Sequence, residues 1–356
     1  MTAGSPSETP PLWSVVVIAR NEAAVIDRSL AAIVLAMAGR SHEILLVDSD
    51  STDGTIEIAA RHPVGIVRLD PRTPKRPSVG RWVGFRLTRG ELVLFVDGDS
   101  IVSREWVDEA ETTLRARPEL AGVDGWRQEV LGQERDLLMA PTSLGAEPPH
   151  LMGTALLRRA AIERAGGMNP FLSSCEEAEL AARLRKAGYR LWRLERPMAW
   201  HERPEKPETI PELFRRMRRG FPLGTGQFVR TVLANRLPVE NAPALVSRHV
   251  GFFTWMVVGV ACFAWGLAAA NWRPLAGWAS ILALAFGLFA LRAGNLRKPT
   301  YYFAEWLFSS PMVVRGLLQR PKGSADFARF AVVHDWFRPI PTPRAGTERL
   351  SGEGQQ

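Results

Sequence analysis

Two long uncharged segments near the C-terminus limit the possible folds most strongly. Gly251–Ala270 contains no charged residue over 20 positions, and a helix of that length spans about 30 Å, the thickness of a bilayer's hydrocarbon core. Leu275–Leu291 is also uncharged and follows after only Asn271–Pro274, a connection that fits a helical hairpin. We predict two transmembrane helices within residues 248–292, with two buried core helices as the alternative.

Basic residues flank this predicted hairpin on both sides. They are Arg230, Arg236 and Arg248 before it and Arg292, Arg297 and Lys298 after it. The positive-inside rule therefore predicts a multi-pass protein of the plasma (inner) membrane with both ends in the cytoplasm. Residues 1–12 are rich in Ser, Thr and Pro without a basic stretch before an apolar one, so we expect a disordered tail there and no signal peptide.

Charge is distributed unevenly along the chain. Residues 1–200 carry 25 basic and 27 acidic residues, whereas residues 201–356 carry 20 and 10. The basic excess thus lies beside the apolar segments, which favours contact with a membrane surface over binding to nucleic acid. With only two cysteines, the chain has no Cys-rich zinc site.

Short strand-like runs and helix-length segments alternate from Trp13 onward. The runs are Ser14–Ala19, Glu43–Val47, Gly65–Leu69 and Leu92–Val96, and the helical segments are Glu22–Ala38, Thr55–Arg61, Val79–Thr88 and Ser103–Ala116. This alternation predicts an α/β, Rossmann-like fold with a mostly parallel sheet over residues 13–220. In such sheets the ligand lies at the carboxyl ends of the strands.

The rest of the chain predicts further elements of this domain and the segments around the hairpin. The domain continues with strands at Ala121–Val130, Leu151–Leu157 and Tyr189–Leu194, helices at Arg159–Ala165 and Glu176–Ala187, and a capped helix from Thr209 to Arg219. We expect a linker or interfacial segment at 221–247, an amphipathic helical segment at 300–338 and a disordered tail at 341–356. Apolar residues recur at helical spacing at Tyr302, Phe303, Trp306 and Leu307. We therefore expect a helix at residues 300–318 that lies in the membrane interface, spans the membrane or packs on the soluble domain. Pro311 would kink that helix.

Polar clusters follow three of the predicted strands. Asp97-Gly98-Asp99 ends the fourth strand, and two carboxylates there suit a divalent cation that also contacts a diphosphate, although a solvated turn gives the same pattern. Ala19-Arg-Asn21-Glu22 follows the first strand, and a run from Asp48 through Asp50 to Thr55 follows the second. Each could be a helix N-cap, but together they predict one shared crevice.

These motifs resemble family 2 glycosyltransferases of GT-A fold, and the resemblance covers Trp13–Gly220. It implies a nucleoside-diphosphate sugar, a UDP- or GDP-sugar, as donor. The residues it assigns to donor binding are Ala19, Asn21, Glu22, Asp48, Asp50, Arg81, Asp97 and Gly98. The Asn usually found beside the family's Arg is Trp82 here. Asp99 with Asp97 would bind Mg²⁺ or Mn²⁺, Asp99 being the direct ligand, and His201 matches a His near the metal or diphosphate, although it could be an ordinary loop histidine.

The same resemblance locates a catalytic acidic pair at Glu176 and Glu177. The family usually has Glu-Asp, so Glu177 stands where the general base is expected with a side chain one methylene longer. Ser174-Cys-Glu-Glu177 is also a capping box, in which this Glu would bond backbone N–H groups. Arg216 and Arg218 lie where polymer synthases of the family carry Gln-x-x-Arg-Trp. They remain candidates for contacting the diphosphate or lipid headgroups, and the missing Gln and Trp argue against a processive synthase.

The resemblance implies an enzyme, an inverting and metal-dependent glycosyltransferase of cell-envelope polysaccharide or glycolipid synthesis. Its acceptor would be a hydroxyl of a membrane lipid or lipid-linked saccharide, contacted by Leu131–His150. A carboxylate base would take the acceptor's proton while the metal offsets charge on the leaving diphosphate. A polyprenyl-phosphate acceptor that needs no base and a non-catalytic membrane scaffold with a nucleotide-binding domain are the alternatives. We expect no nucleic-acid partner, and the oligomeric state is left open.

Overall fold

A computed structural model describes residues 13–131, 143–203, 209–239, 242–321, 327 and 329–334. The predicted tails at 1–12 and 341–356, and most of the predicted acceptor segment at 131–150, lie outside the described residues. The chain divides into two compact units. The first takes its described residues from Met1–Phe171, Glu176–Glu205 and Pro321–Gln356, and the second from Leu172–Cys175 and Lys206–Arg320.

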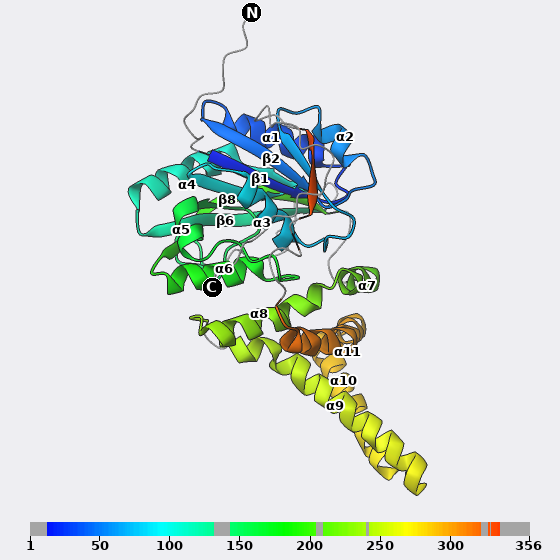
Figure 1. Cartoon of the computed structure of the whole chain (residues 1–356). Helices are drawn as coiled ribbons and strands as arrows, with labels where there is room; N and C mark the ends of the chain where they lie inside the picture. Colours follow the sequence, from blue (N-terminus) through cyan, green and yellow to red (C-terminus); the bar gives the residue numbers. More distant parts are fainter. Residues whose placement is uncertain are drawn as a thin grey trace, which may run out of the picture. The chain divides into compact units, whose positions relative to one another are not determined.

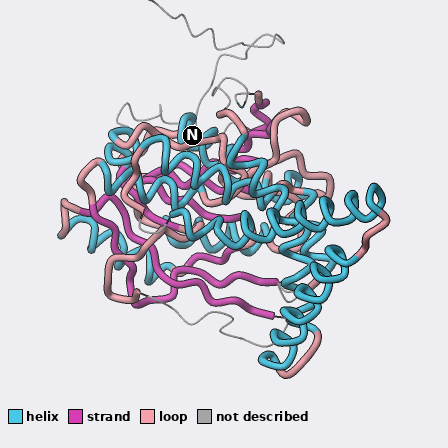
Figure 2. Tube along the Cα trace, turned by 90° about the horizontal axis from the view of Figure 1, so that it is seen from below, coloured by secondary structure: helices cyan, strands magenta, loops and turns pink. Residues whose placement is uncertain are grey.

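The first unit is built on one mixed sheet (Figure 1). Its described strands lie in the order β5-β8-β6-β7-β4-β1-β2-β3-β9. They are β1 (Trp13–Ala19), β2 (His42–Asp48), β3 (Gly65–Leu69), β4 (Leu92–Asp97), β5 (Ser100–Val102), β6 (Leu120–Leu131), β7 (Ala155–Arg158), β8 (Arg190–Arg203) and β9 (Phe330–His334). Strands β3, β2, β1 and β4 run parallel to one another, and Figure 2 shows the strands side by side in magenta.

Helices cover the parallel part of the sheet because its strands are apolar on both faces. The helices of the first unit are α1 (Ile26–Met37), α2 (Thr55–Ala59), α3 (Pro77–Leu87), α4 (Arg104–Ala116), α5 (Arg159–Arg164) and α6 (Glu176–Lys186). In β1, Val15 and Val17 join the buried cluster that contains residues of α1 and α4. Val16 points to the opposite face, where a Cβ added to Gly84 of α3 would lie 2.3 Å from its Cγ1. Such two-sided burial is typical of parallel sheets and confirms the predicted α/β class.

The sheet extends further than the sequence predicts. Strand β5 was not expected, β8 continues to Arg203, and β9 pairs antiparallel with β3. We predicted residues 300–338 as one amphipathic helical segment, and for Phe330–His334 this is wrong. A short strand gains its ladder hydrogen bonds from an available sheet edge, and that edge lies more than 250 positions earlier in the chain.

The second unit has helices and no strand among its described residues. Its helices are α7 (Ile210–Arg218), α8 (Phe221–Asn235), α9 (Ala242–Ala269), α10 (Arg273–Ala293) and α11 (Arg297–Leu318). The expected cap is present, since Thr209 Oγ1 accepts a hydrogen bond from the Glu212 N–H at 3.4 Å. Within the predicted linker or interfacial segment at 221–247, Phe221–Asn235 forms α8, and α9 begins at Ala242. Gly220 in the left-handed region (φ 72°) ends one helix, and Pro222 in the first turn begins the next.

Helices α9 and α10 are long and apolar enough to cross a membrane. Their most apolar 18-residue stretches have mean hydropathies of 1.8 and 1.9, and only 11% and 0% of those stretches are buried. Core helices of a soluble protein would be mostly buried, so the exposure favours the membrane interpretation over the alternative. No other helix within the described parts of the chain meets the same criteria.

Helix α11 continues through Pro311, so the proline does not end it. Its aromatic residues contact those of α9 and α10. For example, Phe303 lies 5.2 Å from Phe286 and 6.3 Å from Phe252 between ring centroids. The predicted apolar stripe is only partly buried, since Leu318 is 77% exposed, and the buried positions of α11 include small residues such as Gly316.

Candidate functional site

The loops that follow β1, β2 and β4 meet at the carboxyl edge of the sheet, as predicted. The backbone N–H of Asn21 donates to Ser51 Oγ at 2.8 Å, and Asn21 Oδ1 accepts from the Thr52 N–H at 2.9 Å. The Gly98 N–H donates to the carbonyl of Ile18 at 2.8 Å, which ties the β4 loop to the end of β1. Asn21 adopts φ 58°, a conformation uncommon outside glycine and found mainly where the surroundings impose it.

Two further candidates for donor binding, Asp48 and Asp50, have different surroundings. Asp48 is fully buried and accepts hydrogen bonds from the backbone N–H, at 2.9 Å, and the hydroxyl of Ser51. Burial raises the pKa of Asp48 although these hydrogen bonds oppose the rise. Asp50 accepts from Lys75 Nζ and, at 2.7 Å, from Arg68 Nη2, and the hydrogen bond from Lys75 lowers its pKa. Asp48 therefore shapes its own loop, and its contact with a nucleotide remains a prediction.

A buried arginine joins the predicted catalytic pair to the end of β4. Arg81 of α3 is 3% exposed. Its Nη2 lies 2.7 Å from Asp97 Oδ1, and its Nη1 lies 2.5 Å from Glu176 Oε1 and 3.2 Å from Glu177 Oε1. Burial opposes the charged form of Arg81, yet the surrounding carboxylates raise its pKa. One guanidinium thus brings together side chains from three elements, and the sequence alone did not reveal this bridge.

The two members of the acidic pair differ in exposure. Glu176 is 4% exposed, and its pKa rises to about 8 because of burial first and the negative charge of Glu177 second, while Arg81 acts in the opposite direction. The side chain of Glu177 is 26% exposed. Glu177 is therefore the carboxylate that solvent or a substrate can reach.

The capping-box alternative for Glu177 finds no support among the described contacts. The Ser174 hydroxyl donates to the carbonyl of Phe221 at 2.8 Å, whereas the carboxylate of Glu177 forms the ion pair with Arg81. The Glu177 carboxylate is thus paired with a guanidinium, and its role as the base stays a prediction.

Sequence reasoning missed Gly153 as a member of this site. Its carbonyl accepts a hydrogen bond from Arg81 Nη2 at 3.3 Å. A Cβ at this position would lie 2.5 Å from Asp97 Oδ2, so only glycine allows this approach.

A buried ion pair holds the backbone just before Gly153. Arg193 Nη2 lies 2.7 Å from Asp124 Oδ2 and donates to the His150 carbonyl at 3.0 Å, and the Met152 N–H donates to Asp124 Oδ2 at 2.9 Å. Asp124 is fully buried and Arg193 is 5% exposed. The partners lie 69 positions apart, and no sequence pattern indicated that they meet.

The predicted metal ligands Asp99 and His201 form a close pair. His201 Nε2 lies 2.6 Å from Asp99 Oδ2, and the register between β5 and β8 opposes Ser100 to His201. Burial works against the charged form, but the hydrogen bond and charge of His201 lower the pKa of Asp99. Asp99 Oδ1 is buried and has no hydrogen-bond partner among the described residues.

The oxygen atoms at Asp99 fit a divalent cation that is held partly by the protein and partly by substrate oxygens. In the part of the chain that the structure describes, no three His, Cys, Asp or Glu side chains form a group that could enclose a metal. Mg²⁺ in phosphate-transferring sites is commonly held by one or two carboxylates together with substrate oxygens. The unsatisfied oxygen of Asp99 matches that chemistry, whereas Asp97 Oδ1 is bound to Arg81.

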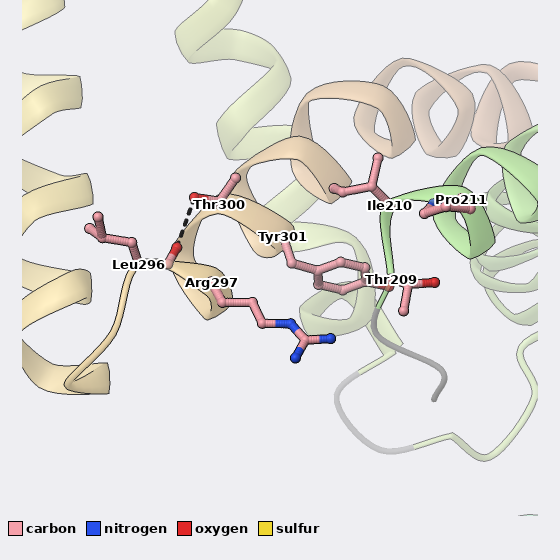
Figure 3. Close-up of a pocket in the computed structure, with 7 residues that line it drawn as sticks. All are labelled: Thr209, Ile210, Pro211, Leu296, Arg297, Thr300 and Tyr301. Atoms are coloured by element: carbon pink, nitrogen blue, oxygen red, sulfur yellow. Dashed lines mark hydrogen bonds between the residues drawn. The ribbon is translucent and has the colours of Figure 1, made fainter. Parts of the chain in front are cut away.

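The remaining candidates, Arg216 and Arg218, lie on α7 in the second unit. The guanidinium of Arg216 lies over the ring of Phe221 at 4.4 Å, and the proposed diphosphate contacts of both arginines stay predictions. The same unit holds a cavity of about 390 Å³ between the first turns of α7 and α11 (Figure 3). It is lined by Thr209, Ile210, Pro211, Leu296, Arg297, Thr300 and Tyr301, none of them a predicted site residue.

Comparison with known proteins agrees with the resemblance. The sequence profile described as "Glycosyl transferase family 2" matches residues 14–166. The succinoglycan biosynthesis protein ExoA of Rhizobium meliloti is 24% identical over 322 residues, which cover 80% of this chain and 94% of ExoA. Glycosyltransferase AglE of Haloferax volcanii is 29% identical over 112 residues, 30% of this chain and 37% of AglE, so the match spans little more than a third of that relative.

A solved structure has a similar fold. The mannosyltransferase PcManGT from Pyrobaculum calidifontis, in complex with GDP-Man and Mn²⁺, superposes with a TM-score of 0.55 at 21% sequence identity. The match covers 88% of this chain and 89% of that one. Together with the order of strands and helices, it assigns the first unit to the GT-A fold.

Proposed function

Because the chain is a family 2 glycosyltransferase with a GT-A fold, we propose that it transfers a sugar with inversion to a hydroxyl of a membrane-associated acceptor. The donor is a nucleoside-diphosphate sugar, a UDP- or GDP-sugar. The acceptor is a lipid or a lipid-linked saccharide. Polysaccharide synthesis fits the similarity to ExoA, whose name assigns it to succinoglycan biosynthesis.

The observation that carries this proposal is the network around Arg81. A partly exposed carboxylate, Glu177, shares one guanidinium with Asp97 at the end of β4. The exposed base and the acidic loop are thereby held at one edge of the sheet. Inverting transfer requires this combination, since one group must deprotonate the acceptor while charge on the leaving diphosphate is compensated.

Asp99 would hold a divalent cation through Oδ1, with Asp97 and His201 beside it. When bound, Mg²⁺ or Mn²⁺ offsets the negative charge that develops on the leaving diphosphate. His201 fixes the orientation of the Asp99 carboxylate through its hydrogen bond to Oδ2. Hydrogen bonding that orients a ligating side chain commonly sets how well a metal is held.

Glu177 takes the proton of the acceptor hydroxyl as that oxygen attacks the anomeric carbon. Arg81 fixes the position of this carboxylate through their ion pair. Glu176 is buried and bound to the same guanidinium, which limits it to orienting Arg81. A single displacement by this route inverts the anomeric centre.

Membrane spans at α9 and α10 would confine the enzyme to the surface where its acceptor is concentrated. Their length, hydropathy and exposure support this role. Arg248 before the pair and Arg292 and Arg297 after it support a cytoplasmic location for both ends. A lipid or lipid-linked acceptor follows from this anchoring.

Nucleotide release from sugar nucleotides tests the proposal. The full chain in lipid vesicles is mixed with UDP-glucose, UDP-galactose or GDP-mannose, Mg²⁺ or Mn²⁺, and a bacterial membrane lipid extract, and released UDP or GDP is measured. We expect release with one of the donors and a loss of about 10²- to 10⁴-fold in Glu177→Gln. Glu163→Gln, an exposed Glu on α5, is the matched control and should retain the wild-type rate.

Two outcomes would change the conclusion. Wild-type protein that releases no nucleotide with any donor, metal or lipid extract contradicts a glycosyltransferase and supports a non-catalytic scaffold. A Glu177→Gln enzyme with nearly full rate contradicts the general base and supports a polyprenyl-phosphate acceptor, whose phosphate is already anionic.

A further inference from the structure

Four residues immediately before the catalytic pair pack with the second unit. The chain leaves the first unit after Phe171, and Leu172–Cys175 belongs to the second unit. It returns to the first unit at Glu176, the first residue of α6. The segment Leu172–Cys175 therefore leads directly into α6, whose first two residues are Glu176 and Glu177.

A buried glutamine of α8 holds this segment by its backbone. Gln227 is 0% exposed. Its Oε1 accepts a hydrogen bond from the Ser173 N–H at 2.8 Å, and its Nε2 donates to Gln319 Oε1 at 2.9 Å. The side chain thus links the segment to α8 and to the residue that follows α11. A buried amide with both ends satisfied has few alternative orientations.

The backbone of α8 also lies directly against Ser174. A Cβ added to Gly224 would lie 2.0 Å from Ser174 Oγ and 2.3 Å from its backbone nitrogen. The Ser174 hydroxyl donates to the carbonyl of Phe221 at 2.8 Å. Because no side chain separates the two backbones, any displacement of α8 would displace Ser174 as well.

Helix α8 is in turn fixed against α11. A Cβ on Gly226 would lie 2.0 Å from the Val313 carbonyl oxygen, and one on Gly316 would lie 2.2 Å from the Leu223 carbonyl oxygen. Helices that approach this closely pack as one rigid pair. Helix α11 begins at Arg297, soon after α10 ends at Ala293, so the pair is connected to the hairpin of apolar helices.

The segment has little freedom at either end. Within the first unit, Arg76 Nη1 donates to the Phe171 carbonyl at 2.6 Å, and Arg81 holds Glu176 and Glu177. Cys175 adopts φ 66°. This left-handed conformation is uncommon for residues other than glycine and persists where the surrounding structure imposes it. Only Ser174 and Cys175 separate Ser173 from Glu176, so the position of Ser173 limits where the chain enters α6.

We infer that Gln227 is a positioning residue, which sets, through Ser173, the place of the first turn of α6 and so of Glu177. Transfer then requires α8 and α11 to be seated as a pair. This inference rests on the proposed function of Glu177 as the base. It assigns to the helices beside the apolar hairpin a second task besides anchoring, the alignment of the base.

Gln227→Met tests this inference, because it keeps the side-chain length and removes both hydrogen bonds. We expect kcat for nucleotide release to fall about ten- to a hundredfold, as small displacements of reacting groups do. The dissociation constant for the sugar nucleotide that the wild type turns over fastest should change less than about threefold, since the donor loops lie elsewhere in the chain. Asn235→Leu makes the same amide-to-apolar change at an exposed position of α8 and should leave both constants unchanged.

Hydrogen exchange gives a readout that does not depend on turnover. In the full chain in vesicles, peptides containing Ser173 should exchange faster in Gln227→Met than in the wild type or in Asn235→Leu, while peptides of β1 and β4 should be unchanged. Ser174→Ala, which loses the bond to the Phe221 carbonyl and the contact of the hydroxyl with Cys175 Sγ, provides a milder variant and should lower kcat a few-fold.

Three results would overturn the inference. They are a wild-type kcat in Gln227→Met, unchanged exchange at Ser173, and a fall in kcat accompanied by weaker donor binding and faster exchange throughout the sheet, which is general unfolding. If the wild type itself releases no nucleotide, the proposed function fails, whereas the exchange at Ser173 still decides whether Gln227 holds the segment.

Discussion

Two carboxylates that lie two positions apart at the end of β4 have opposite surroundings. Asp97 is paired with the buried guanidinium of Arg81, which also holds Glu176 and Glu177. Asp99 pairs with His201 through one oxygen and keeps the other buried and unsatisfied among the described residues. The first arrangement is charge-compensated and suits positioning. The second still has a ligand atom to offer and suits metal binding.

Removing the charge of Asp99 should have the largest effect on turnover. Asp99→Asn keeps the size of the side chain and can still accept from His201, but it loses the negative charge on the free oxygen. We expect nucleotide release to fall about 10³-fold while the free energy of unfolding changes by less than about 1 kcal/mol. Release measured against Mn²⁺ concentration, with thermal unfolding in parallel, checks both. Wild-type release at ordinary Mn²⁺ would show that Asp99 holds no catalytic cation.

Removing the shared guanidinium should instead destabilise the fold. Arg81→Met leaves Asp97, Glu176 and Glu177 close together without a counter-charge, and breaking a buried pair in this way costs about 3–5 kcal/mol. Denaturant unfolding measures the loss. The double variant Arg81→Met/Glu177→Gln should recover part of it, because one of the carboxylates left without a counter-charge is gone. If Arg81→Met has the same free energy of unfolding as the wild type, the ion pairs of Arg81 do not stabilise the fold.

The raised pKa of Glu176 predicts a pH dependence of stability. An isolated Glu titrates near 4.5, whereas Glu176 in the folded protein titrates near 8. Its contribution to stability is fully present below about pH 4.5 and is lost as the pH rises toward 8, by up to about 1.4 kcal/mol per pH unit. Thermal unfolding of wild type and Glu176→Gln between pH 5 and 8.5 should show the wild type losing stability relative to the variant. Parallel profiles would contradict the buried environment of Glu176.

Substitution of Asp50 should have the smallest effect on stability, and it serves as a reference for the substitutions around Asp97 and Asp99. Its partners, Arg68 and Lys75, have side chains that are 42% and 25% exposed, and such partly solvated pairs contribute less than about 1 kcal/mol. Asp50→Asn should therefore lower the free energy of unfolding by less than that amount, as denaturant titration would show. A loss as large as that in Arg81→Met would erase the distinction between buried and exposed ion pairs at this edge.

Local sequence patterns were sufficient for the parallel core and the acidic loops. Apolar runs that end in polar clusters located β1, β2 and β4, and Asp97 and Asp99 follow directly from that pattern. The bridge formed by Arg81 was not predictable in the same way, because its partners come from α6 and β4. Residues such as Gly153 and the Asp124–Arg193 pair act through contacts between distant positions, which a single sequence does not record.

In the helical unit, too, local patterns predicted some helices and missed one that depends on contacts between distant residues. Uncharged length alone identified α9 and α10, since the bilayer thickness fixes the number of residues required. Helix α8 was missed because its first two turns carry Pro222, Gly224 and Gly226, residues that usually indicate a loop. Close packing against α11 and Ser174 accounts for the two glycines, and neither contact leaves a periodic signal in the sequence.

The configuration of the product tests the central claim most directly. The sugar is transferred by the wild-type enzyme in lipid vesicles from the donor that it turns over fastest, and the anomeric configuration of the new linkage is read by proton NMR. An acceptor deprotonated by Glu177 and attacking in one step predicts the configuration opposite to that of the donor. Retention of the donor's configuration would contradict a single displacement and with it the role assigned to Glu177.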